Sequence, residues 1–480
     1  MKKNFTRWAA MALAVVLVGC SAPRTEITLV DAPEQFPQGA SLTLVDHTPE
    51  RETIPHRMEN PSAMDDGVFV DVANVSAVNP PSIIFPDAPR QNTAPSNAVG
   101  RNAWRSPNPV TGEVRAVWIS FLEYDTILMG RTQEQFTANI RGMFDNLHSF
   151  GFNTVIVQVR PFGDALYRSQ LFPWSRFATG TEGRDPGFDP LEIMVREARA
   201  RNFRIEAWVN PYRIRPAGNR TPMSSNNPAV QMMNDRDGSV IQYNGIISYN
   251  PSSQRARNLI VNGIVEIVRN YDIDAIHIDD YFYPTTSPGF DRAFYNAYIN
   301  AGGRMGLADW RRNNVELLLR EIYTAIKRED PTVLFGISPQ ANIDNNFNEQ
   351  YIDVRKILSQ PGFLDYIAPQ IYFGFRNQAW PFERTLRIWN DMITVDGIEL
   401  IIGLGPYKIG LHDTWAGTGA NEWLNTTTIM RDKVQMSRGV SNYNGFAMFR
   451  YDSMFRPSAN VRAQVEREMA NLRPVMNTGR

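Results

Sequence analysis

The chain has 480 residues, of which 43% are hydrophobic and 11% aromatic, so it can bury at least one large core. Its 49 Lys and Arg residues balance 50 Asp and Glu residues, which argues against a nucleic-acid-binding protein. Five His and one Cys argue against a zinc site of the usual type, and we expect no metal site and no cofactor.

The N-terminus has the pattern of a secretory signal. A basic start precedes an apolar run, Trp8 to Val18, that is too short to span a bilayer as a mature helix. The run leads into Leu-Val-Gly-Cys at residues 17–20, which resembles a bacterial lipobox. The resemblance implies that Cys20 carries attached lipid, including palmitate. An ordinary signal peptide with an incidental Cys is the alternative. We therefore expect a signal peptide at residues 1–19. Because Ser21 rather than Asp follows Cys20, the resemblance implies an anchor in the outer membrane of the cell envelope, with the protein facing the periplasm.

Residues 20–112 are rich in Pro, Asn, Ser and Asp and show no sustained helical or strand period. This composition predicts an extended, largely irregular tether between the anchor and the rest of the chain. At the other end we expect residues 459–480 to form a C-terminal helix and tail.

Between these ends, residues 113–458 carry eight apolar, β-branched runs that predict strands. The runs are Val114–Ser120, Thr154–Arg160, Arg204–Asn210, Ala275–Phe282, Leu334–Pro339, Asp365–Phe373, Leu400–Pro406 and Gly445–Tyr451.

Helical patterns separate most of these runs. One starts at Thr132 with Gln135 three residues on, and another at Asp189-Pro190, both recognised helix starts. Further helices are expected at about 254–270, 309–328, 348–359, 381–395, 421–437 and 459–472.

Eight alternating strands and helices predict an α/β fold, a single (β/α)8 TIM barrel. A doubly wound sheet is the competitor, but no Gly-x-Gly-x-x-Gly follows the first strand. Polar and aromatic residues gather after the strands, as at Asn210–Arg213, which favours an enzyme with its site at that face. The long segment 211–253, with Asn, Ser and Gly throughout, is expected to be a loop over this face.

The fourth run ends in two adjacent acids, Asp279 and Asp280. Because side chains alternate along a strand, His277 and Asp279 should point into the barrel, while Ile276 and Ile278 face the helices. Mutual repulsion should raise the pKa of one acid, so that it can act as a general acid near neutral pH. A helix cap, or an ion pair with Arg160 or Arg213, is the structural alternative.

Two other buried polar residues have structural alternatives of the same kind. His277 either contacts the substrate or only hydrogen-bonds to Asp279 and fixes it. Glu206 lies deep in the third run, and we expect it to be the partner of an arginine inside the barrel rather than a catalyst.

Several of these segments together resemble the glycosyl-hydrolase-like family 10, over about residues 113–455. They are Val114–Ile119, Gln158–Asp164, Ala207–Arg213, Ile276–Pro284, Phe335–Pro339 and Tyr366–Tyr372. The resemblance is to the bacterial envelope lipoproteins of this family that cut peptidoglycan strands lacking stem peptides. It implies a TIM barrel and hydrolysis of glycosidic bonds.

The sequence leaves the mechanism open. A two-carboxylate mechanism needs acids on opposite sides of the bond, and the candidates for the second are Glu123, Asp125, Asp164, Asp344 and Asp452. Alternatively, the pair is similar to the Asp-Asp of substrate-assisted N-acetylhexosaminidases. On that analogy Asp279 orients the acetamido group, Asp280 is the acid and base, and Tyr372 positions the amide. Chitinase-type enzymes have Glu where Tyr281 stands.

The interpretation is therefore a glycosidase for N-acetylated cell-wall glycan, with Asp279, Asp280 and Tyr372 as candidate catalytic residues. The alternatives are a hydrolase of another envelope polysaccharide or exopolysaccharide and a non-catalytic, lipid-anchored glycan-binding protein. The partners expected are the glycan and the outer membrane, with no nucleic acid, and the protein is expected to be a monomer. The candidate substrate-binding residues are Arg160, Asp164, Asn210, Tyr212, Arg213, His277, Tyr281, Tyr283 and Gln370.

Overall fold

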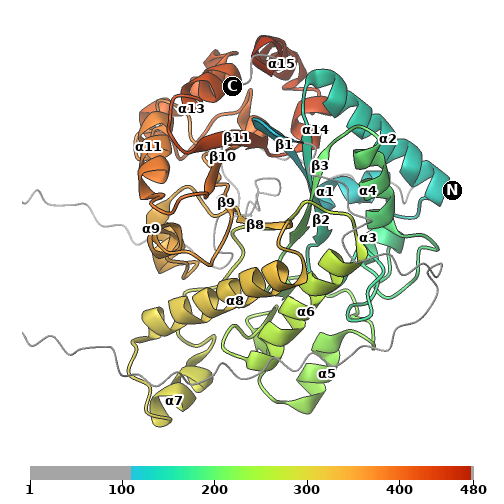
Figure 1. Cartoon of the computed structure of the whole chain (residues 1–480), viewed down its shortest axis with the longest axis vertical. Coiled ribbons are helices and arrows are strands. Elements are labelled where there is room, and N and C mark those ends of the chain that lie inside the picture. Colours follow the sequence, from blue (N-terminus) through green and yellow to red (C-terminus); the bar gives the residue numbers. More distant parts are fainter. Residues whose placement is uncertain (1–109, 477–480) are drawn as a thin grey trace, which may run out of the picture. The chain divides into compact units, whose positions relative to one another are not determined.

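Eight parallel strands close into a barrel in the order β1-β11-β10-β9-β8-β7-β3-β2 (Figure 1). The computed structural model describes residues 110–476, so the expected signal peptide, Cys20 and nearly all of the tether lie outside the described residues. The predicted (β/α)8 barrel is confirmed. The strands are β1 (Val114–Ile119), β2 (Thr154–Arg160), β3 (Arg204–Val209), β7 (Ala275–Ile278), β8 (Leu334–Ile337), β9 (Tyr366–Ile367), β10 (Glu399–Leu404) and β11 (Tyr443–Met448).

Helices surround the strands, and Figure 1 shows α2, α4, α6, α8, α11 and α13 in this outer layer. At α2, Thr132 and Gln135 make both predicted capping hydrogen bonds, and Asp189 caps α4, so both predicted starts are confirmed. The helices are α1 (Phe121–Ile127), α2 (Gln133–Phe150), α3 (Arg176–Thr179), α4 (Pro190–Arg199), α5 (Pro228–Asp235), α6 (Gln254–Asn270), α7 (Arg292–Asn300), α8 (Leu307–Glu329), α9 (Ile343–Asn348), α10 (Val354–Ser359), α11 (Phe382–Met392), α12 (Glu422–Asn425), α13 (Ile429–Ser437), α14 (Tyr451–Phe455) and α15 (Arg462–Met476).

The last helix, α15, packs against α13 and α14 in the outer layer. Its Glu468 is buried and accepts hydrogen bonds from the backbone N–H groups of Ile429 and Met430, at the start of α13. These are donors that no carbonyl within a helix can satisfy, so α15 caps its neighbour.

Side chains alternate along the strands between two apolar layers, the barrel interior and the layer between strands and helices. In β1, Ala116 and Trp118 face the barrel interior, whereas Val117 and Ile119 pack against the helices. The interior mixes small residues with large rings, and Gly336 shows how tight it is. A Cβ atom at position 336 would overlap the ring of Tyr366, so only glycine leaves room for that tyrosine.

A small antiparallel sheet, β4-β6-β5, and helix α5 lie between β3 and α6. Its strands are β4 (Arg213–Arg215), β5 (Val240–Tyr243) and β6 (Ile246–Tyr249). The segment 211–253, expected to be a loop, therefore contains a small sheet and a helix. Asn244 and Gly245, with φ angles of 48° and 82°, form the turn between β5 and β6, and an Asn-Gly pair between apolar runs is a hairpin signal.

The barrel is closed by contacts between the two ends of the described chain. β1 pairs in parallel with β11, and Arg450 donates a 2.7 Å hydrogen bond to the buried carboxylate of Glu123. Arg438 and Tyr443 likewise bind Glu113, just before β1. First and last strands are thus joined by a ladder and by buried ion pairs at both ends.

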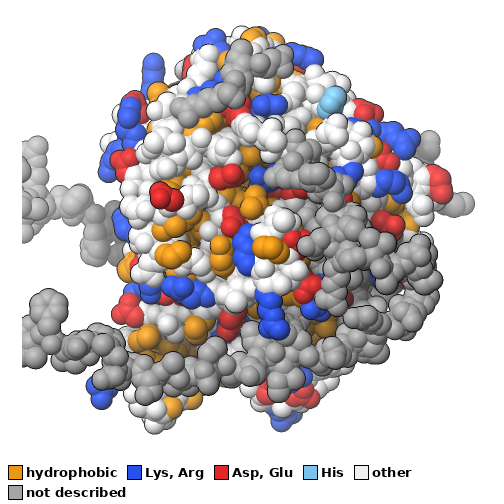
Figure 2. All heavy atoms as spheres, in the orientation of Figure 1, with side chains coloured by type: hydrophobic (Ala, Val, Ile, Leu, Met, Phe, Trp, Pro, Cys, Tyr) orange, Lys and Arg blue, Asp and Glu red, His pale blue; other side chains and the backbone are white. Residues whose placement is uncertain are grey.

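On the face shown in Figure 2, Lys and Arg side chains are interspersed with Asp and Glu, in keeping with the balanced charge of the sequence. Among residues 110–476, no helix combines the length and apolarity needed to cross a membrane.

Candidate active site

The two acids of the fourth barrel strand lie immediately after β7. Ile276 and Ile278 pack in the helix-facing layer, as predicted, and Ala275 lies in the interior cluster. Asp279 and Asp280 are each only 4% exposed. β7 therefore delivers two buried carboxyl groups to the carboxyl-terminal face of the barrel, where TIM-barrel enzymes have their active sites.

Asp279 ends a chain of hydrogen bonds that crosses the strand ends. Its Oδ1 accepts a 2.6 Å bond from Asn210 Nδ2, and Asn210 Oδ1 accepts a 2.6 Å bond from Gln158 Nε2. Gln158 Oε1 in turn accepts from the backbone N–H of Phe121. Because a backbone N–H can only donate, it fixes the direction of both amides, and Asn210 presents a donor that favours the ionised form of Asp279.

The environments of the two acids differ. Burial raises the pKa of Asp279 to about 6, although the charge of Arg213 and the hydrogen bond from Asn210 act to lower it. Burial and the negative charge of Asp279 raise the pKa of Asp280 to about 7, and the hydrogen bond from Gln370 offsets this in part. Because Asp279 accepts from Asn210 and from the backbone N–H of Tyr281, we expect Asp279 to ionise first and Asp280 to keep its proton.

Aromatic side chains surround this pair. The guanidinium of Arg213 lies over the rings of Tyr281 and Phe162, with its Cζ at 4.0 and 4.8 Å from their centroids. Tyr372 is buried, and its ring meets that of Tyr407 edge-on at 5.6 Å. Burial and the neighbouring acids raise the pKa of Tyr372, so its hydroxyl keeps its proton and can donate a hydrogen bond.

Gln370 connects Asp280 to the next strands. Its Nε2 donates to Asp280 Oδ1 at 3.2 Å and to the carbonyl oxygen of Ser338 at 2.9 Å. The structure thus brings Asp279, Asp280, Asn210, Arg213, Tyr281, Gln370 and Tyr372 together from the predicted set.

His277 contacts neither solvent nor Asp279 by hydrogen bond. Trp118 Nε1 donates to His277 Nε2 at 3.1 Å, so the ring proton must lie on Nδ1, which is 2.9 Å from the hydroxyl of Tyr366. Burial and the charge of Arg204 lower the pKa of His277 to about 3, and the ring stays neutral. The alternative that His277 fixes Asp279 directly is wrong, because Trp118 and Tyr366 hold both of its nitrogens, and its role in substrate binding stays a prediction.

Below it, Glu206 accepts from the hydroxyl of Tyr366 and forms a 2.8 Å ion pair with Arg204. The prediction that Glu206 is the buried partner of a barrel arginine is confirmed.

Four other predicted side chains make their contacts away from the carboxylate pair. Arg160 lies over Phe172, and Asp164 accepts from the backbone N–H of Arg176. The ring of Tyr283 packs against Tyr351, and Tyr212 is buried in the helix-facing core. Their roles in substrate binding stay predictions.

The candidates for a second carboxylate are mostly occupied. Glu123 pairs with Arg450, and Asp452 with Arg456. Asp125 and Asp344 are exposed residues of α1 and α9. The fifth candidate, Asp164, is buried and has one oxygen without a partner among the described residues, so it stays the open candidate for a second carboxylate.

Gln158 is the residue of this site that the sequence interpretation did not select, although it lies in a quoted segment. The signal was present: Gln158 follows Ile156 by two residues and so shares its inward face near the end of β2. A polar side chain at an inward position of a barrel strand end is a candidate for the site.

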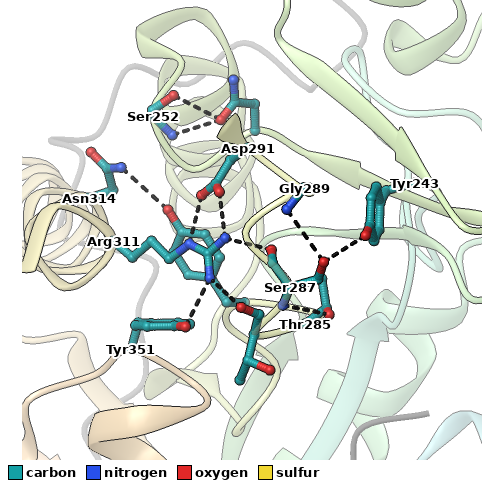
Figure 3. A network of polar contacts seen from close by, with 12 residues as sticks. Tyr243, Ser252, Thr285, Ser287, Gly289, Asp291, Arg311, Asn314 and Tyr351 are labelled. Carbon is teal, nitrogen blue, oxygen red and sulfur yellow. Dashed lines mark hydrogen bonds and ion pairs between the residues drawn. The ribbon is translucent and has the colours of Figure 1, made fainter. Parts of the chain in front are cut away.

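The loop that follows the acids is held by a buried network (Figure 3). Arg311 of α8 binds both oxygens of Asp291 and donates to the carbonyl oxygens of Thr286 and Ser287, at 3.1 and 2.8 Å. The hydroxyl of Tyr243, on β5, lies 2.6 Å from that of Ser287. The network fixes the backbone after Asp280 between α8 and the small sheet.

Comparisons with known proteins identify the family of the chain. A family profile described as glycosyl hydrolase-like 10 matches residues 113–416. Glycosyl hydrolase YngK of Bacillus subtilis is 35% identical over 355 residues, covering 69% of this chain and 68% of that protein. Glycosyl hydrolase DigH of Escherichia coli is 32% identical over 338 residues, covering 65% and 75%.

Among solved structures, the catalytic domain of the β-amylase from Paenibacillus polymyxa aligns with 76% of this chain and 100% of that domain, with 10% identity and a TM-score of 0.48. Among residues 110–476, no three His, Cys, Asp or Glu side chains are grouped so that they could hold a metal ion.

Proposed function

The chain belongs to the glycosyl hydrolase-like 10 family and is a glycoside hydrolase, and we propose that its substrate is the glycan of peptidoglycan, in strands that lack stem peptides. The observation that carries the proposal is the pair of adjacent buried acids in unlike environments, Asp279 and Asp280. Neighbouring acids on one strand do not bracket a bond, but they suit a sugar that carries its own nucleophile.

In this mechanism Asp280, which holds its proton more strongly, gives it to the leaving glycosidic oxygen. The acetamido carbonyl oxygen of the same sugar attacks the anomeric carbon, and the leaving sugar departs as an alcohol. Asp279 accepts the acetamido N–H and stabilises the positive charge of the cyclic intermediate. Asp280, now ionised, takes a proton from water as the water opens that ring.

Four further residues of the site have proposed parts in this mechanism. The hydroxyl of Tyr372 positions the acetamido group, and Tyr281 with Arg213 offers a flat, amphipathic surface to a sugar ring. Asn210 holds Asp279 as a hydrogen-bond acceptor through the chain that starts at Phe121.

The proposal also covers the location of the enzyme in the cell. Lipidation of Cys20 would anchor it to the outer membrane, with the barrel facing the periplasm and the glycan within reach of the tether. Mass spectrometry of the mature N-terminal peptide tests the anchor independently of activity.

Turnover is tested on peptide-free glycan strands, with release of new reducing ends as the measurement. The wild type should cut these strands and should lose activity when the N-acetyl groups are removed, since the nucleophile goes with them. Asp279→Asn and Asp280→Asn should both lose turnover, and Asp391→Asn, an exposed acid on α11, is the control.

Each of the other outcomes would contradict one part of the proposal. Equal rates on deacetylated strands would exclude substrate assistance. Turnover of another N-acetylated polysaccharide but not of these strands would change the substrate. Binding in single-turnover conditions without cleavage would identify a glycan-binding protein.

A further inference from the structure

Arg160 ends β2 but does not face the barrel mouth. The pairing of β2 with β3 shifts register between Gln158 and Arg160, so that Gln158 pairs with Trp208 and Arg160 with Val209. Such a bulge inserts an extra residue and reverses the side of the next one. Gln158 points inward to Asn210, and Arg160 points to the helix layer, with its Cζ 4.4 Å from the centroid of Phe172.

The guanidinium of Arg160 is 1% exposed, and none of its three nitrogens has a hydrogen-bond partner among the described residues. Glycine at position 263 of α6 makes room for it, since a Cβ atom there would lie 2.9 Å from Nη1 and 2.6 Å from the ring of Phe172. A buried charge without partners costs several kcal/mol. Something must therefore accept these N–H groups.

Two tyrosine hydroxyls near Arg160 can each donate one hydrogen bond. The hydroxyls of Tyr167 and Tyr249 are buried and have no partner among the described residues. The charge of Arg160 acts to lower the pKa of both tyrosines, although burial raises it more, and so their hydroxyls stay protonated. Leu166 N–H donates to the carbonyl oxygen of Val159, which holds the Tyr167 segment against the end of β2.

The negative charges of two carboxyl groups, Glu266 and Asp164, favour the charged form of Arg160, but neither group hydrogen-bonds to it. The oxygens of Glu266, one turn after Gly263, already accept from Ser169 Oγ and from the backbone N–H of Gln170, at 2.5 and 2.6 Å. Asp164 has one buried oxygen without a partner. Five N–H groups of an arginine and two tyrosine O–H groups, seven donors, thus outnumber the unpartnered acceptors, which are one oxygen of Asp164 and the two tyrosine oxygens.

We propose that Arg160, Tyr167 and Tyr249 bind a small monovalent anion, of which chloride is the commonest, between β2, β6 and α6. An ion that only accepts hydrogen bonds satisfies a surplus of donors and, unlike a water molecule, also offsets the guanidinium charge. The site is independent of the proposed substrate and of the roles of Asp279 and Asp280. It ties the small sheet, through Tyr249 of β6, to the barrel wall.

The first test is crystallographic and needs no activity. Crystals of the full chain soaked in bromide should show an anomalous peak within hydrogen-bond distance of the Arg160 guanidinium and both tyrosine hydroxyls. An ordinary water, or no density, at that place would overturn the proposal.

The second test is thermal unfolding in gluconate buffer of constant ionic strength, with chloride replacing gluconate. The Tm of the wild type should rise by about 2–4 °C and saturate. The double variant Tyr167→Phe, Tyr249→Phe keeps the packing but loses two donors, and its response should need at least tenfold more chloride. Tyr243→Phe, which removes a hydroxyl that bonds to Ser287 instead, should respond as the wild type does. An unchanged Tm in the wild type would overturn the proposal.

Discussion

Two buried arginines stand near two strand ends of this barrel, and their surroundings are opposite. Arg311 is paired with Asp291 and bonded to two carbonyl oxygens, and it holds the loop after the carboxylate pair. Arg160 is equally buried but bonds to no described residue. The chain can satisfy an interior guanidinium completely where the arginine has a structural role, so the one left unsatisfied indicates a ligand.

The largest effect is expected in the loop after β7. Asp280→Asn should lower kcat by about 10²–10⁴-fold, because the amide cannot protonate the leaving oxygen. The same variant should be more stable than the wild type above pH 7, since it removes a buried charge beside Asp279. Reducing-end release and thermal unfolding measure the two effects. A kcat within twofold of wild type would remove Asp280 from the mechanism.

The next largest effect is on stability, and the same substitution at each of the two arginines allows them to be compared. Arg311→Met leaves Asp291 buried without its partner and should lower the free energy of unfolding by about 3–5 kcal/mol. Arg160→Met removes a charge that no side chain pairs, so in chloride-free buffer its loss should be about 1 kcal/mol or less. Urea denaturation of both variants gives the comparison. Equal losses would mean that both arginines have protein partners.

A smaller effect is expected from adding one methyl group. Gly263→Ala forces a Cβ atom against Phe172 and Arg160 and should cost about 1–3 kcal/mol. Gly142→Ala in α2 meets nothing within 4 Å and should instead stabilise by about 0.5–1 kcal/mol, as alanine does in a helix. If both variants were stabilised in urea denaturation, the space beside Arg160 would be larger than the structure shows.

The smallest effect is on pH dependence. The rate should rise as Asp279 ionises near pH 6 and fall about tenfold per unit as Asp280 loses its proton above about pH 7. Both acids have pKa values raised by folding. Their contribution to stability is therefore full below their ordinary pKa near 4 and is lost as the pH rises through 6 to 7. A profile of kcat/KM from pH 4 to 9 checks the order of the two limbs, and a flat profile would contradict it.

Alternating apolar runs were sufficient to predict the barrel and the direction of Asp279, because a parallel strand buried on both faces leaves few other interpretations. The same alternation failed at Arg160, where one extra residue in β2 reverses the side that a strict period of two assigns. No feature of the sequence Gln158-Val159-Arg160 predicts the bulge. The ladder between β2 and β3 decides it.

The roles of Asn210 and His277 depended on partners that are far apart in sequence. Asn210 meets Asp279 across 69 positions, and His277 meets Trp118 across 159, so no local pattern could assign their hydrogen bonds. The hairpin around Asn244-Gly245 is different, since its signal is local and could have been found.

The closure of β1 on β11 has a consequence for how the chain reaches this structure. Until residues 443–450 have been synthesised, β1 and β10 both have unpaired edges. Such edges can form hydrogen bonds with strands of other chains and so lead to aggregation. Contacts between residues at least 325 positions apart, among them Glu123 with Arg450 and Glu113 with Arg438, therefore accompany the pairing that hides those edges. A chain shortened before β11 would aggregate rather than form a smaller enzyme, and folding should be slow and complete only after synthesis ends.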